Sequence, residues 1–431
     1  MKDLFEILKS RGLIEWVSDE FILQKLLKDN SNLVYCGIDP TGDSLHIGHL
    51  IPLITLKWFQ KYGFKVIPLI GGATGLIGDP SGKSKERNLL NTQTIIKNIN
   101  KIETQLSSLL NQDNSLILNN YNWISKLTFL DILRDIGKHF SINNMISREY
   151  VKSRLEDINK GISYTEFSYV LLQAYDFYYL NKTYNCNIQI GGNDQQGNIL
   201  AGIDYIKKVD NTKNIVGFTQ PLLLNSNGTK FGKTENGENI WLDKYKTSPY
   251  KFYQFWFNRS DNEVERLLKL YTFIELDKIE ELMHTNLEDR LPQRTLAREL
   301  VKLIYDENIL SGIEKVNKIL FNKDIDNIYE VLNDSNNIDL INILSQELKT
   351  LHYLFEGFKS KNIEYDIIDF LIRNDIFKSR SQVKKSINSI YIDNKRLNDI
   401  DELNQLESKL GYHLIRKGKK DNYLISIYER K

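Results

Sequence analysis

The sequence predicts an α/β fold built on a parallel sheet, and three segments carry that prediction. Leu33–Ile38 is an apolar run of β-prone residues, and a turn and an apolar helix over about 47–56 follow it. Residues 65–70 read as the next strand, so a β-α-β unit with parallel pairing is expected. Residues 187–192 read as a later strand that ends in a glycine turn, and ligands bind at such carboxyl edges of open α/β sheets.

The composition fits a globular chain of two or three domains. The 431 residues are 41% hydrophobic and 26% charged, and the net charge is +1, so any nucleic-acid surface must be local. The two cysteines, Cys36 and Cys186, are too few for a disulfide framework or a metal cluster, so a cytoplasmic protein without a metal site is expected. The N-terminal segment contains acids and does not resemble a signal peptide, and no apolar run approaches ~20 residues, so no membrane partner is expected.

The first strand, turn and helix form a candidate phosphate site. Asp39-Pro40-Thr41-Gly42 gives the turn, and free N–H groups at a helix start attract anions. His46 and His49 lie three apart, so both rings can face one ligand, and Gly48 between them leaves room for a flat base or ribose. The alternative is an ordinary helix that begins with two histidines.

A glycine-rich segment, 71–87, follows the second strand and contains Asp79, Lys83 and Arg87. Its glycine spacing is one residue too short for a Walker A loop, so it is not a P-loop. A surface turn is the alternative to a ligand-binding loop. A helix over 91–110, a short strand over 115–118 and helical stretches over 123–158 are expected next.

Residues 165–180 have apolar residues at helical spacing, and Tyr169, Gln173 and Asp176 share one face of that helix. This polar stripe is either the solvated side of the helix or a buried polar pocket. Further on, the loop of 219–234 bears Lys230, Lys233 and Thr234 among glycines. Such a loop suits transient clamping of a polyphosphate, and a hairpin tip with solvated lysines is the alternative.

The remainder of the chain changes in character. Residues 247–320 read as helical, 323–350 as an acidic, Asn-rich linker, and 363–431 as a basic region. A helix over 381–388 and a strand over 389–393 are expected to present its charges to RNA or DNA. The candidate contacts are Lys378, Arg380, Lys384, Lys385, Lys395 and Arg396.

Together these motifs resemble a bacterial-type tyrosyl-tRNA synthetase, a class I aminoacyl-tRNA synthetase, over nearly the full chain. His46-Ile47-Gly48-His49 stands as the HIGH signature, and Lys230-Phe231-Gly232-Lys233-Thr234 stands as the KMSKS loop. The basic end looks like an S4-type RNA-binding module. The resemblance implies a Rossmann-like catalytic domain over 1–246 with a helical insertion at about 123–165, a helical domain over 247–322, a linker over 323–357 and a small α+β S4-like domain over 358–431.

The resemblance also implies site roles. Catalysis is assigned to Thr41, His46, His49, Lys83, Arg87, Lys230, Lys233 and Thr234. Tyrosine binding is assigned to Tyr35, Asp79, Tyr169, Gln173, Asp176, Gln189 and Gln195. ATP binding is assigned to Cys36, Gly37, Asp39, His46, Gly48, His49, Gly192, Asp194, Lys230 and Lys233. Within the tyrosine set, Tyr35 and Asp176 are implied to bind the phenol, and Asp79, Tyr169 and Gln173 the ammonium group.

The implied reaction is attack of the tyrosine carboxylate on the α-phosphate of ATP, followed by transfer to the tRNA terminal ribose. ATP implies Mg²⁺, although no dedicated carboxylate cage is visible. The implied partners are tRNA(Tyr), L-tyrosine, ATP and a second copy of the chain. One departure is Gln196, where the family usually has Trp, which puts the packing of that turn in doubt. A tryptophanyl-tRNA synthetase and an RNA-binding protein with a vestigial nucleotide fold stay open as alternatives.

Overall fold

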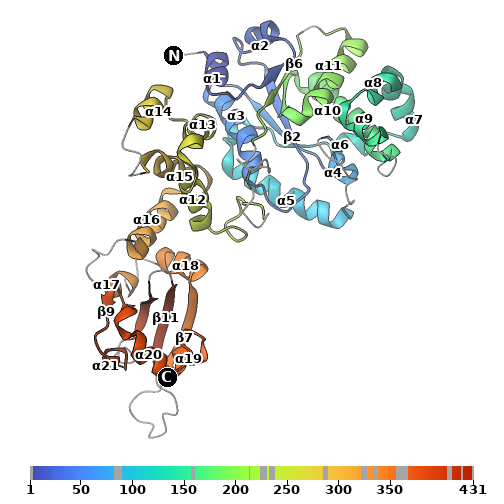
Figure 1. Cartoon of the computed structure of the whole chain (residues 1–431). Helices are drawn as coiled ribbons and strands as arrows, with labels where there is room; N and C mark the ends of the chain where they lie inside the picture. Colours follow the sequence, from blue (N-terminus) through green and yellow to red (C-terminus); the bar gives the residue numbers. More distant parts are fainter. Residues whose placement is uncertain are drawn as a thin grey trace. The chain divides into compact units, whose positions relative to one another are not determined.

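The structure is a computed structural model that describes most of the chain. The described residues are 3–81, 90–156, 161–212, 214–223, 231–232, 238–284, 290–321, 328–333, 338–355, 367–404, 410–418 and 421–429. They form two compact units (Figure 1): Met1–Lys246 with Asn258–Leu296, and Thr247–Phe257 with Ala297–Lys431. This grouping differs from the predicted division, because residues 258–296 group with the first unit and not with the helical residues that follow them.

The first unit contains a six-stranded sheet. Its strands are β1 (Trp16–Val17), β2 (Leu33–Ile38), β3 (Val66–Ile70), β4 (Leu118–Asn119), β5 (Cys186–Gly192) and β6 (Val216–Gln220). They lie in the order β1-β6-β5-β2-β3-β4, and all pairs are parallel except β1 with β6. The predicted parallel sheet is therefore confirmed. The strand expected over 115–118 is shorter, because Ser115 makes only an isolated bridge to Val66.

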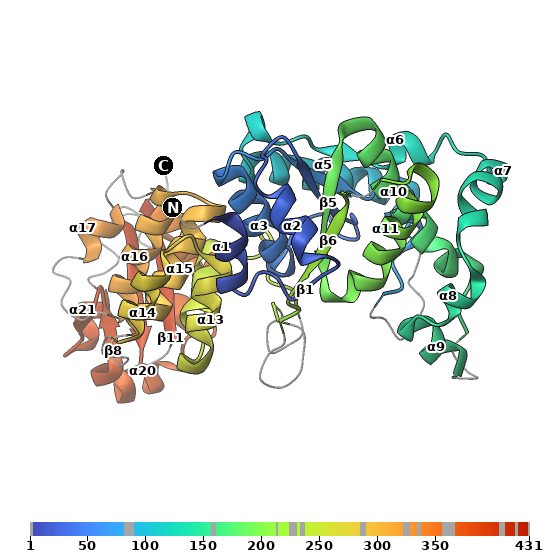
Figure 2. The same ribbon diagram turned by 90° about the horizontal axis from the view of Figure 1, so that it is seen from above.

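Helices lie on both faces of this sheet, and further helices of the unit lie away from it. The helices of the unit are α1 (Leu4–Ser10), α2 (Glu20–Leu26), α3 (Leu50–Lys61), α4 (Thr74–Ile77), α5 (Thr92–Leu109), α6 (Tyr121–Ile124), α7 (Phe129–Asp131), α8 (Ile142–Ile146), α9 (Glu149–Glu156), α10 (Tyr164–Tyr184), α11 (Gln196–Asp210), α13 (Asp261–Tyr271) and α14 (Leu276–Met283). Figure 2 shows α2 and α3 on one side of β5 and β6, and α10 and α11 on the other. Local signals set the ends of the long helices: Asn91 caps α5, Ser163 caps α10, and Asn185 ends α10 in the left-handed conformation.

The strand order creates one place where the chain changes direction across the sheet. From β2 the chain continues outward to β3 and β4, whereas β5 lies on the other side of β2 and leads outward to β6. The carboxyl ends of β2 and β5 therefore flank the topological switch point, which is where open α/β sheets bind ligands.

The second unit contains a five-stranded sheet and the remaining helices. The strands are β7 (Lys349–Phe355), β8 (Ile390–Ile392), β9 (Lys395–Arg396), β10 (Gly411–Lys417) and β11 (Asp421–Glu429), in the order β7-β11-β10-β8-β9. The helices are α12 (Pro249–Phe257), α16 (Glu307–Phe321), α17 (Ile328–Asn333), α18 (Ile338–Glu347), α19 (Ile367–Arg373), α20 (Arg380–Ser386) and α21 (Ile400–Asn404), and α15 (Leu291–Ile304) begins in the first unit and continues into the second. The core of this sheet includes Ile367, Phe377 and Ile425.

The region expected as a linker, 323–357, has regular structure where it is described. It contains α17, α18 and β7, and β7 pairs in parallel with β11 along seven residues from Lys349 to Phe355. Its many Asn and Asp residues obscured a run of apolar residues that are buried in the fold, among them Ile328, Leu332 and Leu344. None of the helices in the described part of the chain combines the length and apolarity needed to span a bilayer.

Candidate functional site

The switch point brings together the predicted nucleotide-binding residues at the ends of two strands. Gly37 is the last residue but one of β2 and Asp39 follows the strand, while Gly192 ends β5 and Asp194 follows it. Nothing lies within 4 Å of a Cβ placed on Gly37, so the surface there is open to a ligand. Cys36 is buried, and burial raises the pKa of its thiol to about 12, so it stays neutral.

The two predicted histidines share the start of the helical segment that follows β2. The backbone N–H of Gly48 donates to His46 Nδ1 at 3.0 Å, and the backbone N–H of His46 donates to His49 Nδ1 at 3.1 Å. Their ring centroids are 4.0 Å apart. Burial lowers the pKa of His49 well below its usual value, and the neighbouring His46 lowers it further. Because each Nδ1 accepts a hydrogen bond, each neutral ring carries its proton on Nε2 and can donate it to an anion.

The second lysine-bearing loop approaches this helix start. The backbone N–H of Ile240 donates to Gly232 O at 2.9 Å, and that of Ile47 donates to Ile240 O at 3.0 Å. Gly232 has φ +95°, and a Cβ there would lie 3.3 Å from Ile47 Cβ. Gly232 of the second motif therefore lies next to Ile47 of the histidine motif. Thr41 is exposed, and its backbone N–H donates to Asp39 O at 2.8 Å.

Five predicted phosphate contacts lie outside the described residues. They are Lys83, Arg87, Lys230, Lys233 and Thr234. Among the described residues, no group of three His, Cys, Asp or Glu side chains could hold a metal ion.

A cluster of buried polar side chains lies on β2, β5 and α10. Tyr35 and Gln189 are paired in register on adjacent strands and are 1% and 3% exposed. The Tyr35 hydroxyl and Gln189 Oε1 are both buried without a hydrogen-bond partner among the described residues. The third member is Asp176, which accepts from Asn120 Nδ2 at 2.9 Å and from Trp123 Nε1 at 2.7 Å. Buried polar atoms are rarely left unpaired in native proteins, so the two orphaned atoms indicate a polar group of a ligand.

The charge state of Asp176 depends on two opposing effects. Burial raises its pKa to about 7, although the bonds from Asn120 and Trp123 lower it. Burial also raises the pKa of the Tyr35 phenol well above its usual value, and the Asp176 carboxylate contributes to that rise. These buried groups can therefore recognise a hydroxyl group by its hydrogen bonds.

A chain of hydrogen bonds runs from Asp176 to the end of β2. Asn120 Nδ2 also donates to Thr74 Oγ1 at 3.0 Å, and Thr74 Oγ1 donates to Asp39 Oδ1 at 2.7 Å. The Tyr169 hydroxyl donates to the other oxygen of Asp39 at 3.0 Å. In the polar stripe predicted on this helix, Tyr169 and Asp176 are therefore buried and Gln173 is partly exposed. Thr74 and Asn120 were not predicted, and no local sequence signal marks them.

The opposite end of the site is rich in hydrogen-bond acceptors. Gln195 Nε2 donates to Asp79 Oδ2 at 2.7 Å. Asn198 Nδ2 lies 3.0 Å from Gln173 Oε1 and 3.2 Å from Gln195 Oε1. Since the Tyr169 hydroxyl donates to Asp39, its oxygen lone pairs are also available to a donor. The carboxylate of Asp79 and these oxygens suit a cationic group such as an ammonium. Asn198, which is 2% exposed, was not predicted.

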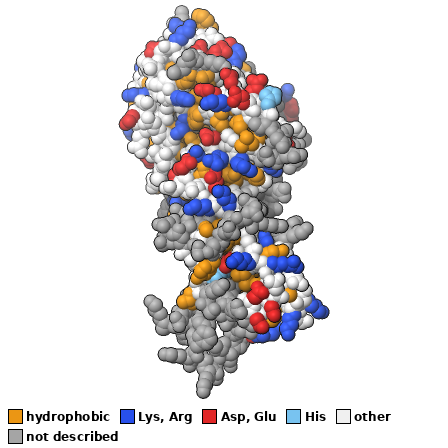
Figure 3. Space-filling model, turned by 90° about the vertical axis from the view of Figure 1, so that its left-hand side faces the viewer, with side chains coloured by type: hydrophobic (Ala, Val, Ile, Leu, Met, Phe, Trp, Pro, Cys, Tyr) orange, Lys and Arg blue, Asp and Glu red, His pale blue; other side chains and the backbone are white. Residues whose placement is uncertain are grey.

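The cations predicted to contact nucleic acid lie on the surface of the second unit. The exposed residues are Lys378, Arg380, Lys384, Lys385, Lys395 and Arg396. Arg380 forms a bidentate ion pair with Asp369, with Nε 2.9 Å from Oδ1 and NH2 2.7 Å from Oδ2. This pair offsets part of the arginine's positive charge. The face drawn in Figure 3 shows basic and acidic side chains interspersed, as expected for a near-neutral chain.

Comparison with known proteins yields close relatives. Residues 27–322 match a family described as tRNA synthetases class I (W and Y), and residues 349–425 match one described as Tyrosine--tRNA ligase SYY-like C-terminal domain. The chain is 42% identical over 434 residues to the Tyrosine--tRNA ligase of Geobacillus stearothermophilus, covering 98% of this chain and 99% of that protein. It is 42% identical over 436 residues to the Tyrosine--tRNA ligase of Lactobacillus johnsonii, covering 99% of each.

A solved structure is also similar. The C-terminally truncated mitochondrial tyrosyl-tRNA synthetase of Aspergillus nidulans matches with a TM-score of 0.67 and 33% identity. The match covers 74% of this chain and 95% of that one.

Proposed function

Because the chain belongs to the tyrosine–tRNA ligases, within the class I tRNA synthetase family (W and Y), we propose that the buried polar cluster binds L-tyrosine and that the helix start after β2 binds ATP. Its reaction is the ATP-dependent ligation of tyrosine to tRNA(Tyr). The reaction passes through tyrosyl-adenylate, and pyrophosphate is released when the adenylate forms. The observation that carries the site assignment is the pair of orphaned buried atoms, the Tyr35 hydroxyl and Gln189 Oε1, beside Asp176.

The phenol of the substrate supplies what this cluster lacks. Its hydroxyl accepts from the Tyr35 hydroxyl, which has no described partner, and donates to the Asp176 carboxylate in addition to the bonds from Asn120 and Trp123. Phenylalanine would leave the Tyr35 hydroxyl buried and unpaired, which costs about 1–3 kcal/mol. Selectivity for tyrosine follows from that penalty.

The ammonium group of tyrosine binds at the acceptor-rich end. Asp79 supplies a carboxylate, and Tyr169 and Gln173 supply oxygen lone pairs. With phenol and ammonium both held, the substrate carboxylate is directed toward the carboxyl ends of β2 and β5. This arrangement converts the attack on ATP into a reaction between two oriented groups.

Adenylate formation needs no protein nucleophile. The substrate carboxylate is already ionised and attacks the α-phosphate of ATP, and pyrophosphate leaves. His46 and His49 donate Nε2–H groups to the phosphates, and Lys83, Arg87, Lys230, Lys233 and Thr234 donate to the leaving group. Mg²⁺ bound with ATP would offset the negative charge of the phosphates, and it would keep much of its own water there.

The chain acts as a homodimer through the helical insertion. Large apolar side chains are exposed there at Phe129, Leu130, Leu133, Ile142, Ile146, Leu155 and Tyr164. Such a concentration of exposed apolar side chains supports a protein interface. Leu130, which is 74% exposed, is the most open of them, so Leu130→Asp should leave the fold intact and shift the sedimentation of the protein from dimer to monomer.

Transfer to tRNA uses the basic surface of the second unit. The S4-like region presents Lys384 and Lys385 on α20 and Lys395 and Arg396 on β9. Cations on a small sheet domain suit the phosphate backbone of tRNA, which carries one negative charge per nucleotide.

Pyrophosphate exchange on the purified chain tests this proposal. Exchange of labelled pyrophosphate into ATP should depend on tyrosine and should be far weaker with phenylalanine or tryptophan. Exchange driven by tryptophan would favour the tryptophan branch of the family. No exchange with any amino acid, from folded protein, would favour an RNA-binding protein whose nucleotide fold is vestigial.

A further inference from the structure

A hydrogen-bond chain links the helical insertion to the proposed ammonium site. Arg148 lies between α8 and α9, and its NH1 donates to Asn198 Oδ1 at 2.9 Å. Asn198 Nδ2 in turn donates to Gln195 Oε1 at 3.2 Å, and Gln195 Nε2 donates to Asp79 Oδ2 at 2.7 Å. The chain therefore connects Arg148 to Asp79 through two carboxamide groups.

The direction of this chain is set by its two ends. An arginine side chain can only donate hydrogen bonds, so the Asn198 atom that faces Arg148 must be the oxygen. An ionised aspartate can only accept, so the Gln195 atom that faces Asp79 must be the nitrogen. Both carboxamides are thus held in one of their two orientations. The orientation of the Gln173 carboxamide is fixed by that of Asn198, because Gln173 Oε1 accepts from Asn198 Nδ2 at 3.0 Å.

We propose that Arg148 is a positioning residue for tyrosine recognition, which acts through Asn198 on the acceptors that bind the ammonium group. The inference rests on the proposed assignment of that end of the site to the ammonium group. Without Arg148, the Asn198 amide can turn over and present its oxygen to Gln173 and Gln195. Those glutamines must then turn as well, and Gln195 would present an oxygen to the Asp79 carboxylate.

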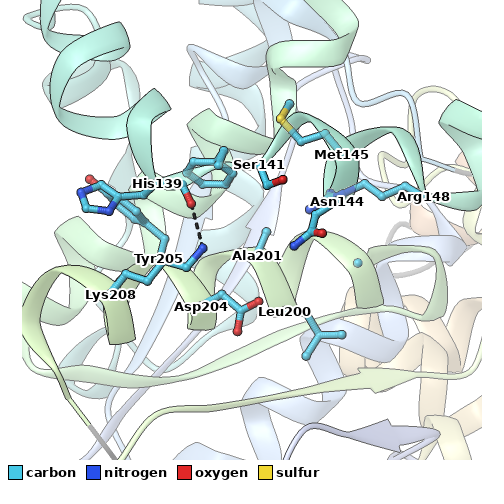
Figure 4. A pocket seen from close by; sticks show the side chains of 12 residues that line it. His139, Ser141, Asn144, Met145, Arg148, Leu200, Ala201, Asp204, Tyr205 and Lys208 are labelled. Carbon is cyan, nitrogen blue, oxygen red and sulfur yellow. Dashed lines mark hydrogen bonds between the residues drawn. The ribbon is translucent and has the colours of Figure 1, made fainter.

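The surroundings of Arg148 provide a matched control. Arg148 lines a cavity of about 210 Å³ between η4 (Gly137–His139), α8 and α11 (Figure 4). Lys208 lines the same cavity, where its Nζ donates to His139 O at 2.8 Å and makes no described bond to Asn198. Replacing Lys208 therefore removes a cation from the same hollow and leaves the carboxamide chain intact.

The test measures Kd by calorimetry on the full-length protein for two ligands. One is L-tyrosine, and the other is 3-(4-hydroxyphenyl)propionate, which keeps the phenol and the carboxylate but lacks the ammonium group. Arg148→Met should raise the Kd for tyrosine about ten-fold, the size expected for losing a hydrogen bond to a charged group, and leave that of the analogue unchanged. Arg148→Lys, which also only donates, should recover part of the loss, and Lys208→Met should change neither Kd.

Two results would overturn the positioning role. If the arginine only supports the fold, Arg148→Met would raise the Kd of both ligands equally. If the amides keep their orientation without the arginine, the variant would change neither Kd. Asp79→Asn separates this failure from a failure of the site assignment. If that variant also leaves the ratio of the two Kd values unchanged, the ammonium group does not bind there and the proposed tyrosine site itself is refuted.

Discussion

The proposed tyrosine site of the first unit and the proposed tRNA-binding surface of the second unit depend on opposite physical means. In the site, Asp176 and Gln189 are almost fully buried, and Asp176 is fixed by bonds from Asn120 and Trp123. On the surface, Lys384, Lys385 and Lys395 are exposed and form no ion pair with a described residue. A buried site depends on the geometry of each atom, so single changes have large effects. An exposed charge surface depends on the number of cations, so effects accumulate in small steps.

The largest effect is expected at the loop lysines, where charge develops on the leaving group. Lys233→Ala should lower the rate of tyrosyl-adenylate formation by about 10²-fold or more, because a donor to a developing charge acts on the transition state. Pre-steady-state kinetics should show this loss with little change in the Kd for tyrosine. Lys244→Ala, which removes an exposed lysine outside the loop, is the control. An unchanged rate in Lys233→Ala would exclude the loop from the chemistry.

A smaller effect is expected at the phenol end of the site. Tyr35→Phe should reduce the preference for tyrosine over phenylalanine in exchange kinetics by about 1–3 kcal/mol, because one hydrogen bond to the phenol is removed. The melting temperature of the ligand-free variant should not fall, since the hydroxyl that is removed has no described partner.

Tyr178→Phe on α10 is the matched control and should leave the preference unchanged. Equal losses for tyrosine and phenylalanine in Tyr35→Phe would contradict the phenol assignment.

Protonation of Asp176 gives the next prediction. Its pKa of about 7 in the folded protein lies above the ordinary value of about 3.9, so the folded state binds more protons between those pH values. The contribution of Asp176 to the free energy of unfolding therefore falls as pH rises through that window. In the proposed complex the substrate phenol donates to the ionised carboxylate and lowers its pKa, so tyrosine binding at about pH 6 should release close to one proton.

Calorimetry in buffers with different ionisation heats measures that proton release. Asp176→Asn has no proton to release and should show none. The same proton count in the wild-type protein and in the variant would place the titrating group elsewhere.

The sequence was informative where the function depends on local spacing. The strand of Tyr35, the histidine pair at 46 and 49, and the shared face of Tyr169, Gln173 and Asp176 all follow from periodicities within one element. The surface cations were equally visible, because a cluster of lysines is exposed in almost any fold. The roles of single residues, such as Gln189, came only through the family resemblance.

The groups that connect the site were not predictable from the sequence. Asn120 and Thr74 join Asp39 to Asp176, but these residues come from separate elements that meet only through the order of the sheet. Asn198 similarly bonds to residues far away in the chain. Strand β7 was assigned to a linker for a related reason: its partner, β11, lies at the other end of the second unit's sequence.

The pairing of β7 with β11 also determines which experiment can test the tyrosine site and the basic surface independently. A cut near Gly357 would leave β7 without β11, so it would expose the edge of a strand in addition to removing cations. Substitutions on the full-length chain avoid this problem. Lys384→Ala with Lys385→Ala and Lys395→Ala removes three exposed charges from the surface. A matched control removes three exposed lysines of the first unit, Lys25, Lys28 and Lys97.

The most direct measurement of the central claim compares pyrophosphate exchange and tRNA aminoacylation on one preparation of the triple variant. Exchange should keep its KM for ATP and tyrosine, whereas KM for tRNA should rise. The slope of log affinity against log salt should flatten by about one for each phosphate that the protein no longer neutralises. The control variant should behave as the wild type. A parallel loss of exchange and aminoacylation in the triple variant would contradict the claim that chemistry and tRNA affinity reside in separate regions of the chain.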